Sequence, residues 1–520
     1  MAAHTETLIL EPVGSEVIDS DSASHTSLSD NGSGNVAMAS RLRKAGVTFQ
    51  LSGVNFASSA TNGLVVVGLP RMTADLNIPP SLAFWPSSVP GLATASALLL
   101  AGAFADVLGP KAMDLVACIV SGAMIVGCGF TRRGEELVAL RALQGIALAL
   151  HLSSSVALIT KIMPRGKGRN LSFACLGLSQ PLGFSFGLVM GGVLVDTIGW
   201  RAGWYLYGGI TLLLSVIGAW ALPASEPLGD LQTIMRRVRT KVDGPGALLA
   251  SAFMSLISYF LAIISTDVYQ IKKPSSIILL CFGVLALPLF VGWMHRQNRA
   301  GKPALIPNSF WSNSSFATIC ATTALSFAVL NSLELFASLY FQEIQRFSAL
   351  QAALRIIPSV VVGVALNFTT GLVVHKIPAV WLIVITCLLT AGSPLLMALI
   401  QPQSTYWTGA FFAQILMPFS VDVLFTVGLI IVTETFPDDK QAIAGAVFNT
   451  AAQFGNSLGL AVMQVVSTLV AKNNANMVPP GAILEGYRAG FWTMLAFMIS
   501  CAAISGIGLR KTGKIGLKQE

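Results

Sequence analysis

The sequence predicts an all-α integral membrane protein with fourteen transmembrane helices. Hydrophobic residues make up 54% of its 520 residues and charged residues only 11%, whereas soluble domains carry about 25% charged residues. The apolar residues occur in long blocks, and a helix needs about 20 of them to cross a bilayer. The weak alternating runs of about ten residues that mark a membrane β-barrel are absent from the sequence.

Short connections separate the blocks, so no sizeable soluble domain fits between them. Residues 1–48 are rich in Ser and Asp and poor in large apolar side chains, which predicts a disordered cytoplasmic tail. The fourteen expected helices cover residues 49–69, 83–104, 112–130, 136–159, 171–195, 203–222, 245–266, 275–294, 314–340, 350–374, 379–400, 406–433, 441–470 and 488–509.

A weak internal repeat divides the chain into two six-helix halves. The sequence "QPLGFSFG" (180–187) resembles "QFGNSLG" (453–459), with glycines four residues apart in both. In duplicated carriers of this kind, substrate sites lie near the membrane midplane between the halves. The expected organisation is an N-terminal half at 49–222, a basic cytoplasmic loop at 223–244, two additional helices at 245–294, a C-terminal half at 314–509 and a cytoplasmic tail at 510–520. The basic loop is expected to form a helix on the inner leaflet.

The net charge of +8 reflects membrane topology. Most lysine and arginine residues fall on the cytoplasmic side if the amino terminus is cytoplasmic, as the positive-inside rule requires. Both termini are therefore expected in the cytoplasm, and nucleic-acid binding is not expected. The sequence has no nucleotide-binding P-loop and no zinc-binding H-E-x-x-H motif, so neither an enzyme nor a bound cofactor or metal is predicted.

The connection "GAFADVLGPK" (102–111) carries the first functional motif. Glycine and proline favour the tight turn that so short a gap needs. The alternative interpretation is an ordinary charged turn. The pattern G-x-x-x-D-x-x-G-x-K resembles the signature of the major facilitator superfamily, in which this element latches one conformation. The resemblance assigns that role to Gly102, Asp106, Gly109 and Lys111.

Two further elements resemble the same superfamily. The sequence "ELVALRALQG" places Arg141 inside the fourth span, where an arginine is costly unless it faces protein or water. The family gives this arginine a part in proton transfer; a structural ion pair is the alternative. The fifth span resembles an antiporter element that permits close helix packing, at Gly183, Gly187, Gly191 and Gly192. Together with fourteen spans, these elements resemble the fungal drug:proton antiporters that export secondary metabolites and toxins.

A proton carrier needs a titratable group within the membrane. The first span has Asn62 where relatives often have an acid, and the carboxylates singled out inside spans are Glu334 and Asp422. Burial favours the neutral form of a carboxyl group, which allows it to bind and release protons. We expect Asp422 or Glu334, assisted by Arg141, to couple proton entry to substrate exit. Hydrogen bonding between helices is the structural alternative.

Polar residues inside other spans are candidates for a central substrate cavity, although interhelical hydrogen bonds are their competing use. Mixed with phenylalanines, they suit an amphipathic organic molecule better than a small ion. The candidates are Asn62, His151, Gln180, Asn331, Asn449 and Gln453, with Phe327, Phe336, Phe448 and Phe454.

The resemblance implies a proton-coupled exporter of amphipathic organic molecules. Its expected partners are a small-molecule substrate, protons and membrane lipid, and a monomer in the plasma membrane is expected, with a vacuolar or vesicular location as the alternative. Uptake of a small nutrient such as ammonium is the second hypothesis. A non-transporting membrane sensor is the third, and it would normally bring a large soluble signalling tail.

Overall fold

The computed structural model describes residues 30–79, 82–163, 167–222, 236, 242–266, 268–302, 304–474, 476–477, 481–510 and 512–513. The helix expected in the loop at 223–244 and the tail at 510–520 therefore lie almost entirely outside the described residues. The chain separates into two units, residues 1–43 and 44–520.

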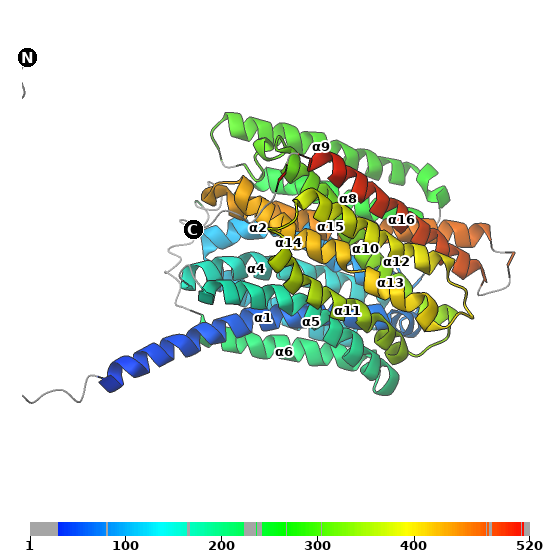
Figure 1. Ribbon diagram of the computed structural model, residues 1–520, viewed down its shortest axis with the longest axis horizontal. Helices are drawn as coiled ribbons and strands as arrows, with labels where there is room; N and C mark the ends of the chain where they lie inside the picture. Colours follow the sequence, from blue (N-terminus) through cyan, green and yellow to red (C-terminus); the bar gives the residue numbers. More distant parts are fainter. Residues whose placement is uncertain are drawn as a thin grey trace, which may run out of the picture. The chain divides into compact units, whose positions relative to one another are not determined.

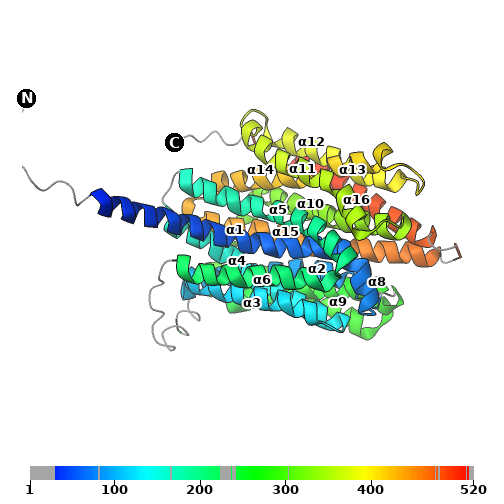
Figure 2. The same cartoon turned by 90° about the horizontal axis from the view of Figure 1, so that it is seen from below.

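The described part of the chain is helical and contains no strand (Figures 1 and 2). The first half comprises α1 (Asp30–Asp75), α2 (Trp85–Leu108), α3 (Pro110–Phe130), α4 (Gly134–Ile162), α5 (Lys167–Thr197) and α6 (Trp200–Ala221). Two helices follow, α8 (Gly244–Thr266) and α9 (Pro274–Arg299), with the short η1 (Val268–Lys272) between them and η2 (Asn308–Phe310) after them. The second half comprises α10 (Ser314–Leu339), η3 (Tyr340–Ile344), α11 (Ala349–Val373), α12 (Ala379–Leu399), η4 (Tyr406–Thr408), α13 (Ala410–Leu416), α14 (Phe419–Thr435), α15 (Asp438–Asn473) and α16 (Gly481–Gly508).

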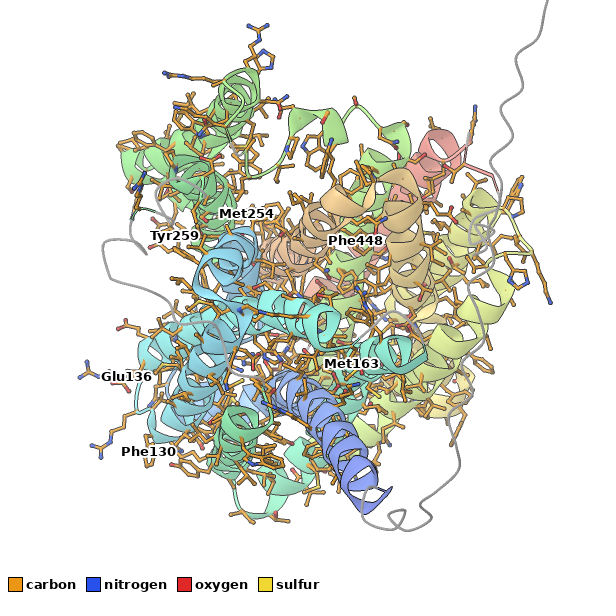
Figure 3. The ribbon with its side chains drawn as sticks, turned by 90° about the vertical axis from the view of Figure 1, so that its left-hand side faces the viewer. Phe130, Glu136, Met163, Met254, Tyr259 and Phe448 are labelled. Atoms are coloured by element: carbon orange, nitrogen blue, oxygen red, sulfur yellow. The ribbon has the colours of Figure 1, made fainter. Side chains whose placement is uncertain are left out.

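Thirteen stretches within the described residues are helical, long and apolar enough to cross a membrane. They correspond to the second to fourteenth expected spans, and the first expected span lies inside α1. The helical, strand-free membrane fold predicted from the sequence is therefore confirmed. In the end-on view of Figure 3, Phe448 lies inside the bundle and is fully buried, whereas Phe130 and Glu136 lie at its edge.

Two boundaries differ from the expectation. Helix α1 begins at Asp30, so residues 30–48 are helical where the sequence predicts part of a disordered tail. The sequence "VAMASRLRKA" in this region is rich in good helix formers, which explains the extension. The span expected at 406–433 is also divided, because α13 ends at Leu416 and α14 begins at Phe419. Pro418 lacks the backbone N–H that would continue the helix.

Glycines set the closest helix contacts in both halves. A Cβ atom at Gly183 would overlap the carbonyl oxygen of Phe56, and one at Gly187 would overlap that of Ala60. Helices α5 and α1 therefore touch through their backbones. In the second half, Gly455 of α15 has the same relationship to Ala324 of α10. The two similar sequence segments thus make the same kind of contact in each half.

The additional helices α8 and α9 form an apolar surface. Large hydrophobic side chains of α9, such as Ile278, Phe282 and Leu289, are exposed. A groove of about 340 Å³ runs between α8 and α9, with Leu249, Leu256, Ile278 and Phe282 among its lining residues. Exposed apolar surface of this extent is covered by lipid in a membrane protein.

Candidate functional site

Arg141 of α4 is completely buried and hydrogen-bonded through all its nitrogens. Its Nη1 donates to Thr61 Oγ1 at 3.0 Å and to Gln144 Oε1 at 2.7 Å. Its Nη2 donates to Asn62 Oδ1 at 2.7 Å, and its Nε donates to the Pro86 carbonyl at 3.1 Å. All four acceptors are neutral, so these contacts do not form the ion pair that is the structural alternative for this arginine. Among the described residues, every hydrogen-bond acceptor of the guanidinium is therefore a neutral dipole.

A close approach of α2 to α4 supports this arrangement. A Cβ atom at Gly145 would overlap the carbonyl oxygen of Pro90, and Thr94 Oγ1 donates to the Gly145 carbonyl at 2.9 Å. The Trp204 ring of α6 lies 5.4 Å from the Arg141 guanidinium carbon, a cation–π distance. The arginine is therefore held from helices α1, α2, α4 and α6.

The two carboxylates predicted to bind protons lie in the second half. Glu334 of α10 is 8% exposed and accepts no hydrogen bond from any described residue. Helix α14, which carries Asp422, packs against α10. The structure thus places Glu334 and Asp422 on neighbouring helices, whereas the hydrogen bonds of Arg141 go to neither of them. A buried carboxylate without a partner is costly when ionised, so protonation relieves a real penalty here.

The interrupted helix positions Asp422. This residue lies in the first turn of α14, where the helix dipole favours a negative charge. Asn367 Nδ2 of α11 donates to Asp422 Oδ1 at 2.9 Å. The absence of a side chain at Gly363 leaves room for the carboxylate, because a Cβ atom there would lie 2.6 Å from Asp422 Oδ2. Sequence periodicity alone does not reveal this break in the middle of an apolar span.

The residues of the predicted latch are spread around the turn between α2 and α3. Gly109 has φ +87° and separates the two helices, a backbone conformation that favours glycine. Lys111 Nζ donates to the Leu222 carbonyl at the end of α6, at 2.9 Å, which is a favourable place for a cation. A Cβ atom at Gly102 would meet no atom within 4 Å. The side chain of Asp106 lies outside the described residues.

Five of the six predicted cavity residues are at least partly exposed. Asn62 contacts Arg141, and Gln180 Nε2 donates to Asn55 Oδ1 at 3.3 Å. Asn331 and Asn449 donate to carbonyls one turn earlier in their own helices. His151 differs, because it is 1% exposed. Gln453 is partly exposed. Of the four candidate phenylalanines, Phe327 and Phe454 are partly exposed, whereas Phe336 and Phe448 are fully buried.

His151 belongs to a buried cluster whose other members, Asp114 and Cys118, are not predicted as site residues from the sequence. Its Nδ1 lies 2.8 Å from Asp114 Oδ1, and Cys118 Sγ lies 3.8 Å from His151 Nδ1. Asp114, Cys118 and His151 are residue types that can bind metal. A tetrahedral zinc ion would hold nitrogen and oxygen ligands about 3.3 Å apart, so the shorter 2.8 Å contact fits a hydrogen bond better. The signal in the sequence was an aspartate inside the span expected at 112–130.

One set of contacts between the two halves lies near the end of α5. Asp196, near the end of α5, accepts hydrogen bonds from the backbone N–H groups of Ala349 (3.2 Å) and Leu350 (3.0 Å) at the start of α11. A Cβ atom at Gly192 would lie 2.7 Å from Leu350 Cα. Ser338 Oγ of α10 also donates to the Val66 carbonyl of α1 at 2.8 Å. Because consecutive spans alternate in direction, the end of α5 lies on the opposite side of the bundle from the α2–α3 turn.

Comparison with known proteins agrees with this architecture. Residues 51–460 match the Major Facilitator Superfamily. MFS-type transporter 1 of Pyricularia oryzae is 37% identical over 92% of this chain and 85% of its own length. A low affinity ammonium transporter of Saccharomyces cerevisiae is 24% identical over 82% of this chain and 79% of its own length. The efflux pump terJ of Aspergillus terreus is 24% identical over 72% of this chain and 67% of its own length.

A solved structure shows the same fold. The bacterial homolog of the human lysosomal transporter Spinster, in an inward-facing and unoccupied conformation, superposes with a TM-score of 0.64. It is 16% identical in sequence, and the match covers 90% of this chain and 98% of that one. Family match, fold and buried charged groups lead to one conclusion: the chain belongs to the Major Facilitator Superfamily and is a secondary transporter.

Proposed function

We propose that this transporter exports amphipathic organic molecules in exchange for protons. The observation that carries the proposal is the placement of Glu334 and Asp422 on α10 and α14, two spans of the second half that pack against each other. A secondary transporter needs groups that change charge during its cycle, and a carboxylate in apolar surroundings is costly to keep ionised. Each proton that enters down a potential of about 100 mV supplies about 2.3 kcal/mol.

Arg141 supplies a buried positive charge in the first half. Because its four acceptors are neutral, the guanidinium creates a positive potential that disfavours a proton nearby. A proton entering the carrier would therefore favour the carboxylates of the second half. In this proposal the second half binds the proton at Glu334 or Asp422, and the first half contributes the positive potential of Arg141.

The contacts of Asp196 with α11 support an alternating-access cycle. They close one end between the halves, which the positive-inside rule places on the outer side of the membrane. The proposed orientation has both termini in the cytoplasm, and the proposed location is the plasma membrane, where the protein acts as a monomer.

Export of an organic molecule is favoured over uptake by the partly exposed aromatic residues Phe327 and Phe454, which lie close in sequence to the polar Asn331 and Gln453. These residues would suit a fungal secondary metabolite, toxin or drug, and the A. terreus relative is named an efflux pump. Ammonium uptake is the second candidate, because the S. cerevisiae relative is named an ammonium transporter. Ammonium is small and needs few aromatic contacts.

Purified protein in sealed vesicles separates these candidates. Ethidium represents the amphipathic cargo and radiolabelled methylammonium represents the nutrient, each measured with and without an imposed pH gradient. We expect ethidium to move against the proton flow and methylammonium not to move. Movement of methylammonium alone would favour uptake. Ethidium flux that ignores the gradient would contradict proton coupling.

Variants test the assigned carboxylates. Glu334→Gln and Asp422→Asn should each reduce the dependence of ethidium flux on the gradient. Glu135→Gln is the matched control, because Glu135 is exposed near the start of α4. If both test variants keep full gradient-driven transport, Glu334 and Asp422 are not the coupling residues.

A further inference from the structure

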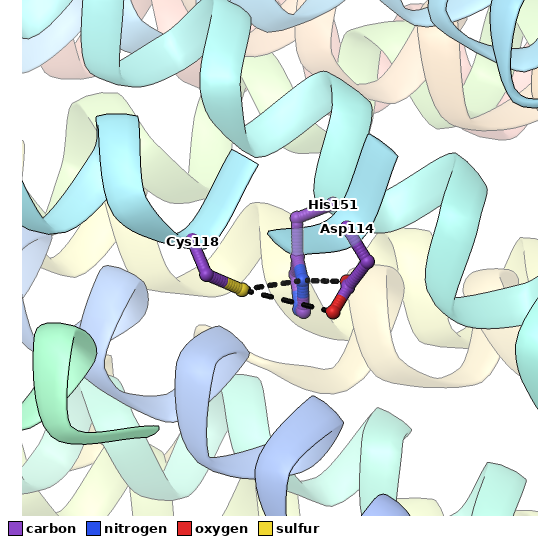
Figure 4. Close-up of side chains that lie close together, drawn as sticks. All are labelled: Asp114, Cys118 and His151. Carbon is purple, nitrogen blue, oxygen red and sulfur yellow. Dashed lines mark hydrogen bonds and ion pairs between the residues drawn. The ribbon is translucent and has the colours of Figure 1, made fainter. Parts of the chain in front are cut away.

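A buried cluster in the first half combines ionisable side chains from two helices (Figure 4). Asp114 and Cys118 lie four residues apart on α3 and so share a face, and His151 faces them from α4. Gln50 of α1 closes the cluster, with Nε2 3.0 Å from Asp114 Oδ2 and 3.4 Å from Cys118 Sγ. Each of these four residues is at most 1% exposed.

The hydrogen bonds of the cluster define how many protons it holds. His151 Nδ1 lies 2.8 Å from Asp114 Oδ1, and its Nε2 lies 3.2 Å from the Leu51 carbonyl oxygen. A carbonyl oxygen can only accept, so Nε2 must carry a proton. A second proton is needed between Nδ1 and Oδ1. Gln50 already donates to the other carboxylate oxygen, which favours an ionised Asp114 beside a doubly protonated imidazole.

With Asp114 ionised and His151 doubly protonated, the pair carries no net charge. Removal of the shared proton leaves one net negative charge in a site without water access, which is costly in apolar surroundings. The pair therefore keeps its proton in this conformation. It can release the proton only in a conformation that exposes the pair or brings a cation to it.

Among the described residues, no lysine or arginine side chain forms a hydrogen bond or an ion pair with Asp114 or His151. Cys118, with Sγ 3.8 Å from Asp114 Oδ2, is the titratable neighbour on α3, and α1 contributes the neutral Gln50 amide. Lys111 lies one turn before Asp114, but its Nζ is bonded to the Leu222 carbonyl. Arg141 lies ten residues before His151 on α4, a distance of about 15 Å along the helix. Cys118 also packs with the apolar side chains of Val54 of α1 and Leu214 of α6.

We propose that Asp114 and His151 form a second proton-binding site, in the first half of the transporter, which releases its proton during alternating access. The step transfers one proton from the His151–Asp114 hydrogen bond to water and returns one proton later, so no other reactant is needed. The inference rests on the proposed proton coupling for its role in transport. The protonation of the pair rests only on the geometry above.

Nitrogen-15 spectroscopy of the histidine ring tests the protonation directly. Replacement of His4, His25, His295 and His375 by glutamine leaves His151 as the source of the signal. We expect both ring nitrogens of His151 to carry protons and the Asp114→Asn variant to show one unprotonated nitrogen. Cys118→Ala, which removes the thiol but not the pair, should keep the doubly protonated signal. An unprotonated ring nitrogen in the otherwise unchanged protein would overturn the proposal.

Transport measurements test the role of the pair. Ethidium accumulation in vesicles is measured under a pH gradient and compared with ethidium exchange without a gradient. If the carrier couples one proton fewer to each ethidium, the ethidium accumulation ratio falls about tenfold for each unit of pH difference across the vesicle membrane. We therefore expect Asp114→Asn and His151→Gln to lower the quotient of gradient-driven to gradient-free flux. A structural role alone would lower both fluxes together and leave the quotient unchanged, which contradicts the proposal.

Two controls separate this inference from its alternatives. If the unmodified carrier shows no gradient dependence, proton coupling itself fails, while the nitrogen-15 signal still decides the protonation of the pair. If Zn²⁺ binds the purified protein with one-to-one stoichiometry and the binding is lost in Cys118→Ala, the cluster is a metal site and the proposal is wrong.

Discussion

Asn62 Oδ1 accepts a hydrogen bond from Arg141 Nη2 at 2.7 Å. An amide thus stands where a carboxylate could neutralise the guanidinium, and the cation remains without a counter-charge among its hydrogen-bond partners. Asn62 is exposed whereas Arg141 is completely buried. The exposed amide of Asn62 therefore connects the buried guanidinium to the accessible surface through one hydrogen bond.

Asn62→Asp should stabilise the protein at neutral pH. The new carboxylate makes a charge-assisted hydrogen bond to Arg141, which is about twice as strong as a neutral one. The gain should be present while the carboxylate is ionised and should disappear when acid protonates it. Thermal unfolding in detergent at several pH values measures the effect. Equal melting temperatures of variant and parent at neutral pH would contradict it.

Arg141→Lys should destabilise the protein although the charge is kept. A lysine ammonium cannot reach the acceptors that the planar guanidinium bridges on three helices. Each buried acceptor left without a donor costs about 1–3 kcal/mol. The measurement is the melting temperature, and the control is Arg132→Lys, since Arg132 is exposed before α4. Similar small changes in both variants would argue against the hydrogen-bond geometry.

Gly363→Ala should disturb Asp422. The added Cβ atom would lie 2.6 Å from Asp422 Oδ2, so the carboxylate must move away from Asn367. Crowding of this kind costs about 1–3 kcal/mol, and the dependence of transport on the pH gradient should fall as well. Gly445→Ala in α15 is the control, because a Cβ atom there meets nothing within 4 Å. Unchanged coupling in Gly363→Ala would show that the position of Asp422 is not critical.

The sequence predicts local features of this site well and contacts between helices poorly. Apolar blocks located the helices, and the penalty for an arginine in lipid marked Arg141 as an internal group. The partner of His151 could not be predicted, because Asp114 is near the start of its span and resembles an interfacial residue. Its contact with His151 depends on how α3 packs against α4. The break before Asp422 required recognition that Pro418 divides an uninterrupted apolar run.

Gly187→Ala should strongly destabilise the first half. The added Cβ atom would overlap the Ala60 carbonyl oxygen, and backbone atoms cannot rotate away, so α1 and α5 must separate. Gly177→Ala on the same helix is the matched control, since nothing lies within 4 Å of its Cβ position. Alanine there should raise helix stability by about 0.5–1 kcal/mol. Melting temperatures of the two variants should therefore move in opposite directions, and shifts of the same sign would contradict the α1–α5 contact.

Asp196→Ala should open the end of the bundle that Asp196 closes. The variant loses the acceptor for the N–H groups of Ala349 and Leu350, and a buried donor left without an acceptor costs about 1–3 kcal/mol. Because this contact joins the halves only while they are together, its loss should shift the population toward separated states. Spin labels at Ile198→Cys and Trp407→Cys, with exposed Cys281 replaced by serine, report the distance between the halves. The control is Asp75→Ala, because Asp75 Oδ2 accepts from Trp200 Nε1 at 3.0 Å within one half. A longer distance in Asp196→Ala but not in Asp75→Ala is expected, and identical distance distributions would rule out a closing role for Asp196.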